Sequence, residues 1–369
     1  MQDELFKSFF MGGFECSSHR NSQGRRLDLI DATRHDEFAE ADYARMIEIG
    51  MLTGRDGVRW HLIETEPFSY DFSSLAKQVA AAKATGIQII WDLFHYGFPD
   101  DIDIFSAEFI ERFARFCSAT AVYLQEELGP DLIVCPVNEI SFFAWIAGEK
   151  GVFYPSVKKR GDELKAILIR AALAATDAIR DACPTARFVL TDPAIHVAAQ
   201  SDTPAARRAA ENYRLAQFEA FDMLAAEDDV RQESNALGLD ILGLNYYFHN
   251  QWRHPSRRKI ERGHPEYRPL HEILLEFHKR YDRPIFIAET GIEDEMRPDW
   301  LNYVCSEVMI AREKGLAING VCLYPIANHP GWADGRHCHN GLWDYPDKNG
   351  AREIYQPLAD ELAKWIEKI

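Results

Sequence analysis

The sequence predicts an α/β protein, folded as a single (β/α)8 barrel of the TIM-barrel class. Two observations lead to this prediction. Short apolar runs alternate with amphipathic segments eight times along the 369 residues. Two of these runs also end in a carboxylate, at Asn138-Glu139 and at Glu289-Thr290. Regular alternation implies right-handed crossovers and a parallel sheet, and eight such units close a barrel.

The first two units show how each element is recognised. Phe9–Phe14 is a short aromatic strand, and Asp36–Met51 after it has apolar residues at helical spacing. The second predicted strand is Gly57–Leu62, and Ser73–Thr85 follows as an alanine-rich helix. Gly86 ends that helix, as a glycine commonly does.

The third unit joins Ile87–Leu93, which is β-branched and aromatic, to a long amphipathic helix over Ala107–Leu128. The remaining strands are apolar runs, predicted at Leu132–Val137, Arg187–Thr191, Leu239–Leu244, Ile285–Ala288 and Ile318–Leu323. Periodic segments predict the other helices, at Asp162–Ala182, Ala205–Ala226, Leu270–Tyr281, Asp299–Lys314 and Glu353–Lys368.

A doubly wound open sheet is the structural rival, but no GxGxxG motif follows the first strand. No Ser/Gly linker or short repeat divides the chain, so one domain is expected over residues 1–369. The segment Phe248–Arg268 is the largest irregular insert.

Composition limits the classes of partner. The net charge of −17 argues against a general nucleic-acid or membrane-surface binder, because both need a positive field. Seven cysteines form no CxxC pair and several lie in apolar runs, which favours buried free thiols in a reducing compartment. The N-terminus resembles no secretory signal and no run is long enough for a membrane span, so a cytoplasmic location is expected.

The predicted strand ends carry the residue types that carbohydrate chemistry needs. Barrel enzymes place reacting groups at the carboxyl ends of strands. Here these ends supply hydroxyl-binding polar groups, aromatic side chains and two carboxylates, the pair that glycoside hydrolysis requires. In chain order the ends give Glu15, His19, Arg59 to Glu64, His95, Asn138, Glu139, Asn245, Tyr246, Glu289, and Tyr324 to Trp332.

At four of these places the chain resembles the family 1 glycoside hydrolases, retaining β-glycosidases of one barrel clan. The similar segments, in order, are Phe94-His-Tyr-Gly-Phe-Pro99, Asp240-Ile-Leu-Gly-Leu-Asn-Tyr-Tyr247, Ile287-Ala-Glu-Thr-Gly-Ile292 and Trp332-Ala-Asp-Gly335. The resemblance implies a β-glucosidase-like catalytic domain that acts on a small carbohydrate or glycoside by double displacement. It implies neither a cofactor nor a metal.

The resemblance also implies roles for individual residues. Glu139 would be the general acid/base and Glu289 the nucleophile. The side chains expected to orient Glu289 are Arg59 and the hydroxyl of Tyr246, while Asn245 belongs to the same strand end. The expected sugar-binding residues are His95, Asn138, Trp332 and Tyr324.

The glycone pocket departs from the common β-glucosidase pattern. His19 stands where the family has a Gln, Tyr324 where it has a Trp, and Gly331 where it has a Glu that binds the outer hydroxyls. A simple glucoside or galactoside specificity is therefore not expected. The chain also lacks the Ser-x-Lys-x-Tyr pattern of 6-phospho-glycosidases after the eighth strand.

Alternative interpretations stay open at this point. One alternative is a transglycosylase that uses the same site. The other is a non-catalytic carbohydrate-binding or regulatory protein on a hydrolase scaffold. Arg59 would pair with Glu64 or Glu66 if it served only the scaffold. The basic stretch over residues 252–262 is a solvated loop or a site for an anionic substrate, and the His337-Cys338-His339 cluster lacks a paired ligand set for zinc. The oligomeric state is open.

Overall fold

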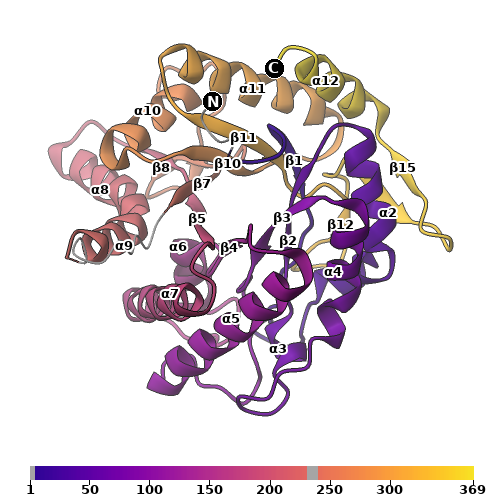
Figure 1. Ribbon diagram of the computed structural model, residues 1–369. Coiled ribbons are helices and arrows are strands. Elements are labelled where there is room, and N and C mark those ends of the chain that lie inside the picture. The colour runs from indigo at the N-terminus through magenta and orange to yellow at the C-terminus, as the bar shows by residue number, and fades with distance from the viewer. Residues whose placement is uncertain (1–4, 231–239) are drawn as a thin grey trace.

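The computed structural model describes residues 5–230 and 240–369. Within them, eight parallel strands close a barrel, with β1 hydrogen-bonded to both β2 and β11. Figure 1 shows this closure as the indigo first strand beside the orange one near the end of the chain. The barrel strands are β1 (Phe10–Gly13), β2 (Thr53–Gly57), β3 (Gln88–Asp92), β4 (Ile133–Cys135), β5 (Arg187–Pro193), β7 (Ile241–Asn245), β10 (Ile285–Thr290) and β11 (Ile318–Leu323). The predicted (β/α)8 fold is confirmed.

Helices surround the barrel on its outside (Figure 1). The main ones are α2 (His35–Glu48), α4 (Ser73–Thr85), α5 (Ala107–Leu128), α7 (Gly161–Ala182), α8 (Pro204–Leu215), α9 (Glu219–Val230), α10 (Leu270–Tyr281), α11 (Arg297–Glu313) and α12 (Gln356–Ile366). Short helical segments are α1 (Leu29–Ala32), α3 (Trp60–Ile63), α6 (Ile140–Phe143), a π-helical turn η1 (Ala144–Glu149) and the 3-10 turns η2 (Ala216–Phe218) and η4 (Asp294–Met296).

Local sequence explains the helix ends that were predicted correctly. Gly86 closes α4 in the left-handed conformation, at a φ of 72°. The Ser106 side chain accepts a hydrogen bond from the Phe109 amide and thereby starts α5. The predicted helix over Ala205–Ala226 is instead two helices, because the chain turns through η2 between α8 and α9.

The second strand lies four residues earlier than predicted. The segment Gly57–Leu62 is not a strand, and its second half forms α3. The strand is Thr53–Gly57, with the sequence Thr-Gly-Arg-Asp-Gly. It has polar residues because this part of the barrel interior is polar. A search for apolar runs therefore does not find it. Trp60, which suggested a strand, packs among Phe109, Phe113 and Phe116 in the helix layer.

The segment Phe248–Arg268 is more regular than predicted. It contains β8 (Gln251–His254) and β9 (Arg258–Lys259), which form a small sheet with β6 (His196–Ala199) outside the barrel. Two further hairpins follow the last barrel strand: β12 (His329–Pro330) with β13 (His337–Cys338), and β14 (Trp343–Pro346) with β15 (Arg352–Ile354).

Two apolar layers hold these elements together. The inner layer fills one part of the barrel with side chains such as Met11, Ile90 and Phe286. The outer layer packs the barrel against its helices. All seven cysteines are free and buried, as predicted. Among the helices described, none is long and apolar enough to cross a bilayer.

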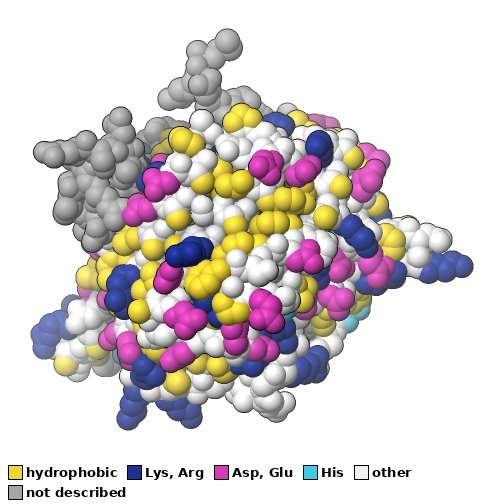
Figure 2. All heavy atoms as spheres, turned by 60° about the horizontal axis from the view of Figure 1, so that its bottom comes forward, with side chains coloured by type: hydrophobic (Ala, Val, Ile, Leu, Met, Phe, Trp, Pro, Cys, Tyr) yellow, Lys and Arg dark blue, Asp and Glu magenta, His cyan; other side chains and the backbone are white. Residues whose placement is uncertain are grey.

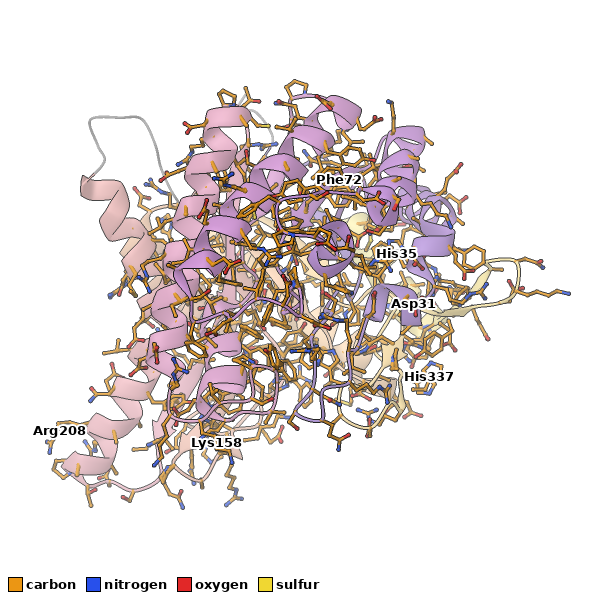
Figure 3. All side chains as sticks on the ribbon, turned by 90° about the horizontal axis from the view of Figure 1, so that it is seen from below. Asp31, His35, Phe72, Lys158, Arg208 and His337 are labelled. Carbon is orange, nitrogen blue, oxygen red and sulfur yellow. The ribbon has the colours of Figure 1, made fainter. Side chains whose placement is uncertain are left out.

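Figure 2 shows one outer face on which acidic and basic side chains are interspersed. No single sign of charge dominates this face. Figure 3 shows Lys158, Arg208 and His337 in the lower half of its view, on segments that follow β4, β6 and β11. Barrel proteins build their sites at the end of the barrel where the carboxyl ends of the strands meet.

Candidate active site

A cavity of about 1170 Å³ contains both predicted carboxylates, Glu139 and Glu289. His95 and Trp332 also line it, as expected for a sugar-binding site. Farther residues of the lining come from helices and hairpins outside the barrel, including Trp145, Tyr213 and Trp252. The cavity is therefore large enough for more than one sugar ring and carries aromatic side chains along its wall.

Glu289 is held by a cation and a hydroxyl. The Arg55 Nη1 atom donates to Oε1 at 2.7 Å, and the Tyr247 hydroxyl donates to Oε2 at 2.8 Å. Glu289 is only 4% exposed and Arg55 is fully buried. Burial raises the pKa of Glu289, while Arg55 and the Tyr247 hydroxyl counteract that shift. These contacts favour the ionised carboxylate.

Among the described residues, the side chain of Glu139 has only neutral hydrogen-bond partners. Asn245 Nδ2 donates to its Oε1 at 2.9 Å, and the Tyr96 hydroxyl donates to Oε2. No described cation forms an ion pair with Glu139. Burial and the nearby Glu289 carboxylate raise its pKa. The two carboxyl groups therefore differ in their surroundings, since Glu289 has a cationic donor and Glu139 has neutral donors.

Strand register explains why the two groups share one site. Asn245, at the end of β7, is paired with Glu289 on the adjacent strand β10. The side chain of the same Asn245 reaches Glu139, which lies beyond β4 on the other side. Glu139 itself adopts a left-handed backbone with φ at 50°, anchored by its amide on the Thr191 carbonyl. Such a conformation in a non-glycine residue is uncommon and often occurs at functional positions.

A polar network lies beneath the carboxylates. Arg55 donates to both oxygens of Asp92, at 3.1 and 2.7 Å, and to Asn138 Oδ1 at 2.6 Å. Asn138 Nδ2 lies 3.1 Å from His95 Nε2, and His95 Nδ1 lies 3.0 Å from Asp92 Oδ2. These two contacts orient both ring nitrogens of His95. The network fixes His95 at the cavity wall.

Asn138 is therefore not free to bind a ligand. Its Oδ1 accepts from Arg55 and from the Thr191 hydroxyl, and its Nδ2 donates to His95 and Tyr96. The residue is fully buried and does not line the cavity. In place of the predicted contact with a sugar hydroxyl, the Asn138 side chain holds Arg55, His95 and Tyr96 in position.

The expected contact between Arg59 and Glu289 is wrong. Arg59 Nη1 lies 3.1 Å from Asp36 and 3.4 Å from Asp28, on the helix side of the barrel. Since the true strand is four residues earlier, Arg55 takes the interior position. Arg59 serves the scaffold, although through different carboxylates from the predicted Glu64 and Glu66.

The expected contact of Tyr246 with Glu289 is also wrong. Side chains alternate along a strand, so Asn245 and Tyr247 face the site while Tyr246 faces away. The Tyr246 hydroxyl lies 2.9 Å from that of Tyr267, and its ring stacks on Trp300. Because every second side chain of a strand faces the same side, a site-facing Asn245 predicts a site-facing Tyr247, and the sequence could have identified this contact with Glu289.

His19 and Tyr324, two positions at which the chain departs from the family pattern, lie outside the cavity lining. His19 is fully buried against Phe153, with ring centroids 3.8 Å apart, and does not line the cavity. Its two ring nitrogens have no hydrogen-bond partner among the described residues, and burial lowers its pKa to about 4. Tyr324 is also buried outside the lining and stacks on His95. Neither residue is a sugar platform, whereas Trp332 lies at the cavity.

One cluster in the described part of the chain has metal-ligand residue types: Cys16, Asp92 and His95. Both Asp92 oxygens already accept from the Arg55 guanidinium, whose positive charge opposes a cation. Burial raises the pKa of the Cys16 thiol well above its usual value. These residues do not fit a metal ion.

The sequence reasoning missed three residues at the carboxylates: Arg55, Tyr247 and Tyr96. Arg55 was hidden in an unrecognised strand. Tyr96 was noted only as part of the turn after β3, and its left-handed backbone, with φ at 68°, directs its hydroxyl to Glu139. That contact has no signal in the local sequence.

The fold is similar to solved structures over nearly the whole chain. A family 1 β-glucosidase from Thermotoga maritima matches with a TM-score of 0.76 at 16% identity, covering 97% of this chain and 96% of that one. The AHE enzyme from Alicyclobacillus herbarius gives 0.80 at 18%, covering 100% and 98%. Virulence factor SghA from Agrobacterium tumefaciens gives 0.77 at 19%, covering 97% of each chain.

No protein-family model matches the sequence, and no curated protein matches it. At identities this low the likeness establishes a shared barrel fold. It does not establish a shared activity.

Proposed function

We propose that this protein is a retaining β-glycosidase that hydrolyses O-glycosidic bonds, with Glu139 as general acid/base and Glu289 as nucleophile. The observation that carries the proposal is the contrast between the two carboxylates. Glu289 has an Arg and a Tyr hydroxyl as donors, whereas Glu139 is buried among neutral partners. Glycoside hydrolysis by double displacement needs this division of roles.

In the first step, a Glu289 oxygen attacks the anomeric carbon as the bond to the leaving oxygen breaks. Glu139 gives its proton to that oxygen, so the alcohol leaves neutral and a glycosyl ester forms on Glu289. In the second step, Glu139 takes a proton from water, and the water oxygen attacks the anomeric carbon. The ester bond breaks, Glu289 regains its charge, and the sugar keeps its configuration.

The cavity supports a small glycoside as the substrate. Aromatic side chains on its wall suit the C–H faces of sugars, and polar groups near the carboxylates suit hydroxyls. The free buried thiols fit a reducing compartment, so we propose a cytoplasmic substrate.

A panel of activated aryl β-glycosides tests the proposal. The protein should release the aryl alcohol from at least one sugar, with retention of the anomeric configuration by NMR. Glu289→Gln should reduce the rate by about a thousandfold or more, because the nucleophile is lost. Glu111→Gln, which changes an exposed Glu of α5 outside the cavity, should retain activity. Inversion of configuration, or normal activity of Glu289→Gln, would exclude the mechanism.

The same panel distinguishes the alternatives. A transglycosylase would transfer the sugar to an added acceptor alcohol in preference to water. A non-catalytic carbohydrate-binding protein would bind sugars tightly and turn over none of the panel. The separate environments of Glu139 and Glu289 favour catalysis, because a protein that only binds sugar has no need of one protonated and one ionised carboxyl group.

A further inference from the structure

Glu15 is a further buried carboxylate that lines the cavity, and the proposed mechanism does not use it. It follows β1, is 6% exposed, and lines the cavity with Glu139 and Glu289. His95, which lies beside the catalytic pair, has its Nε2 atom 4.0 Å from Glu15 Oε1. Glu15 therefore reaches the part of the cavity where the glycone of a substrate would lie.

The carboxylate is only partly satisfied by the protein. Its Oε1 accepts from the Ser17 amide at 3.0 Å, while Oε2 accepts no hydrogen bond from the described residues. No described Lys or Arg pairs with it. Burial acts to raise the pKa of Glu15, but His95, His329 and the hydrogen bonds from Ser17 outweigh it and lower the pKa. A carboxylate oxygen that lines the cavity and has no donor from the described residues can accept a hydrogen bond from a ligand.

Glu15 lies beside the hairpin that follows β11. Strands β1 and β11 are neighbours in the barrel. The hairpin after β11 brings His329 close to Glu15 and carries Gly331 on the cavity wall. A Cβ atom at Gly331 would lie 2.6 Å from Asp334 Oδ1, the end of an exposed side chain, so only Asp334 would need to move to admit one.

We propose that Glu15 binds the glycone, accepting hydrogen bonds from hydroxyls remote from the anomeric carbon, and so selects neutral polyhydroxylated sugars. This inference rests on the proposed glycosidase function. A carboxylate with a free oxygen accepts from hydroxyl donors strongly, because the acceptor is charged. It repels a carboxylate or phosphate on the same sugar. Uronides and 6-phosphoglycosides should therefore be poor substrates.

The test is a cycle between protein and substrate variants. Wild-type protein and Glu15→Gln are assayed on the best aryl glycoside of the panel and on its 3-, 4- and 6-deoxy analogues. Glu15→Gln should lower kcat/KM on the parent sugar by about 10- to 100-fold. For the wild type, kcat/KM on at least one deoxy analogue should be lower than on the parent sugar by a similar factor. On that same analogue, kcat/KM of Glu15→Gln should be little lower than that of the wild type.

Controls separate the possible failures. Glu111→Gln, which changes an exposed Glu outside the cavity, should preserve both the rate and the discrimination between sugars. If Glu15→Gln does not fold by thermal unfolding, Glu15→Asp keeps the charge and should weaken the same discrimination. Unchanged discrimination in a folded Glu15 variant, or efficient cleavage of a uronide, would overturn the inference while leaving the glycosidase function standing. Absence of turnover by the wild type on every sugar would instead refute the proposed function.

Discussion

Replacing Tyr247 by Phe removes one hydroxyl and tests how Glu289 is held. That hydroxyl donates to Oε2 at 2.8 Å, within the normal range for a hydrogen bond to a carboxylate. Hydrogen bonds to charged groups contribute about 1.5–3 kcal/mol. If the bond serves the ionised nucleophile, kcat/KM should fall by about 10- to 150-fold, at about 1.4 kcal/mol for each factor of ten.

The pH profile gives a second, independent readout. The Tyr247 hydrogen bond lowers the pKa of Glu289, so its removal should raise that pKa. Because the nucleophile has to be ionised, the acidic limb of kcat/KM should move to higher pH. The assay is the initial rate on the best aryl glycoside across the acidic limb, for wild type and variant.

Tyr246→Phe is the matched control, one residue away. Its hydroxyl contacts Tyr267 and Gln251 rather than Glu289. Its loss should reduce the free energy of unfolding by about 1 kcal/mol and leave the acidic limb in place. A larger loss of activity in Tyr246→Phe than in Tyr247→Phe would refute the assignment of these neighbours.

Three other results are expected. Tyr96→Phe removes a hydrogen bond that lowers the pKa of Glu139, so the basic limb of the rate profile should move to higher pH by about half to one unit; a shift to lower pH would contradict the contact. Because the folded-state pKa of Glu139 is raised, wild-type stability present at low pH is lost as pH rises through that pKa. Glu139→Gln should therefore gain in Tm over the wild type as pH increases, and a gain largest at acidic pH would have the wrong sign. Thiol reagents should modify the native protein slowly and all seven cysteines after unfolding, since every thiol is buried; rapid labelling of the native protein would contradict that burial.

The sequence predicted the barrel because its strong signals are local. Apolar runs and amphipathic helices each bury one face, and their alternation determines the topology. The helices over Ser73–Thr85 and Ala107–Leu128 have the predicted bounds, because a glycine or a serine caps them. The positions of Glu139 and Glu289 at the cavity follow from the same rule, since the carboxyl ends of barrel strands meet at one end.

The groups around the carboxylates were harder to predict, for a physical reason. A barrel strand that serves a polar site has polar residues facing inward, so it lacks the apolar run by which strands are recognised. For this reason the strand that carries Arg55 was not predicted. The contact with Glu289 that Arg55 makes was assigned to Arg59 instead. The contact between Tyr96 and Glu139 depends on a left-handed turn, and such tertiary contacts leave no periodic pattern.

Covalent trapping tests the central claim most directly, because it identifies the nucleophile chemically. A 2-deoxy-2-fluoro glycoside with an activated leaving group, matched to the best sugar of the panel, should inactivate the protein by slowing breakdown of the glycosyl ester. Mass spectrometry of the digested protein should then find one sugar on the peptide that contains Glu289, and none in Glu289→Gln. A sugar attached to any other residue, or inactivation without an adduct, would contradict the assignment of Glu289 as the nucleophile.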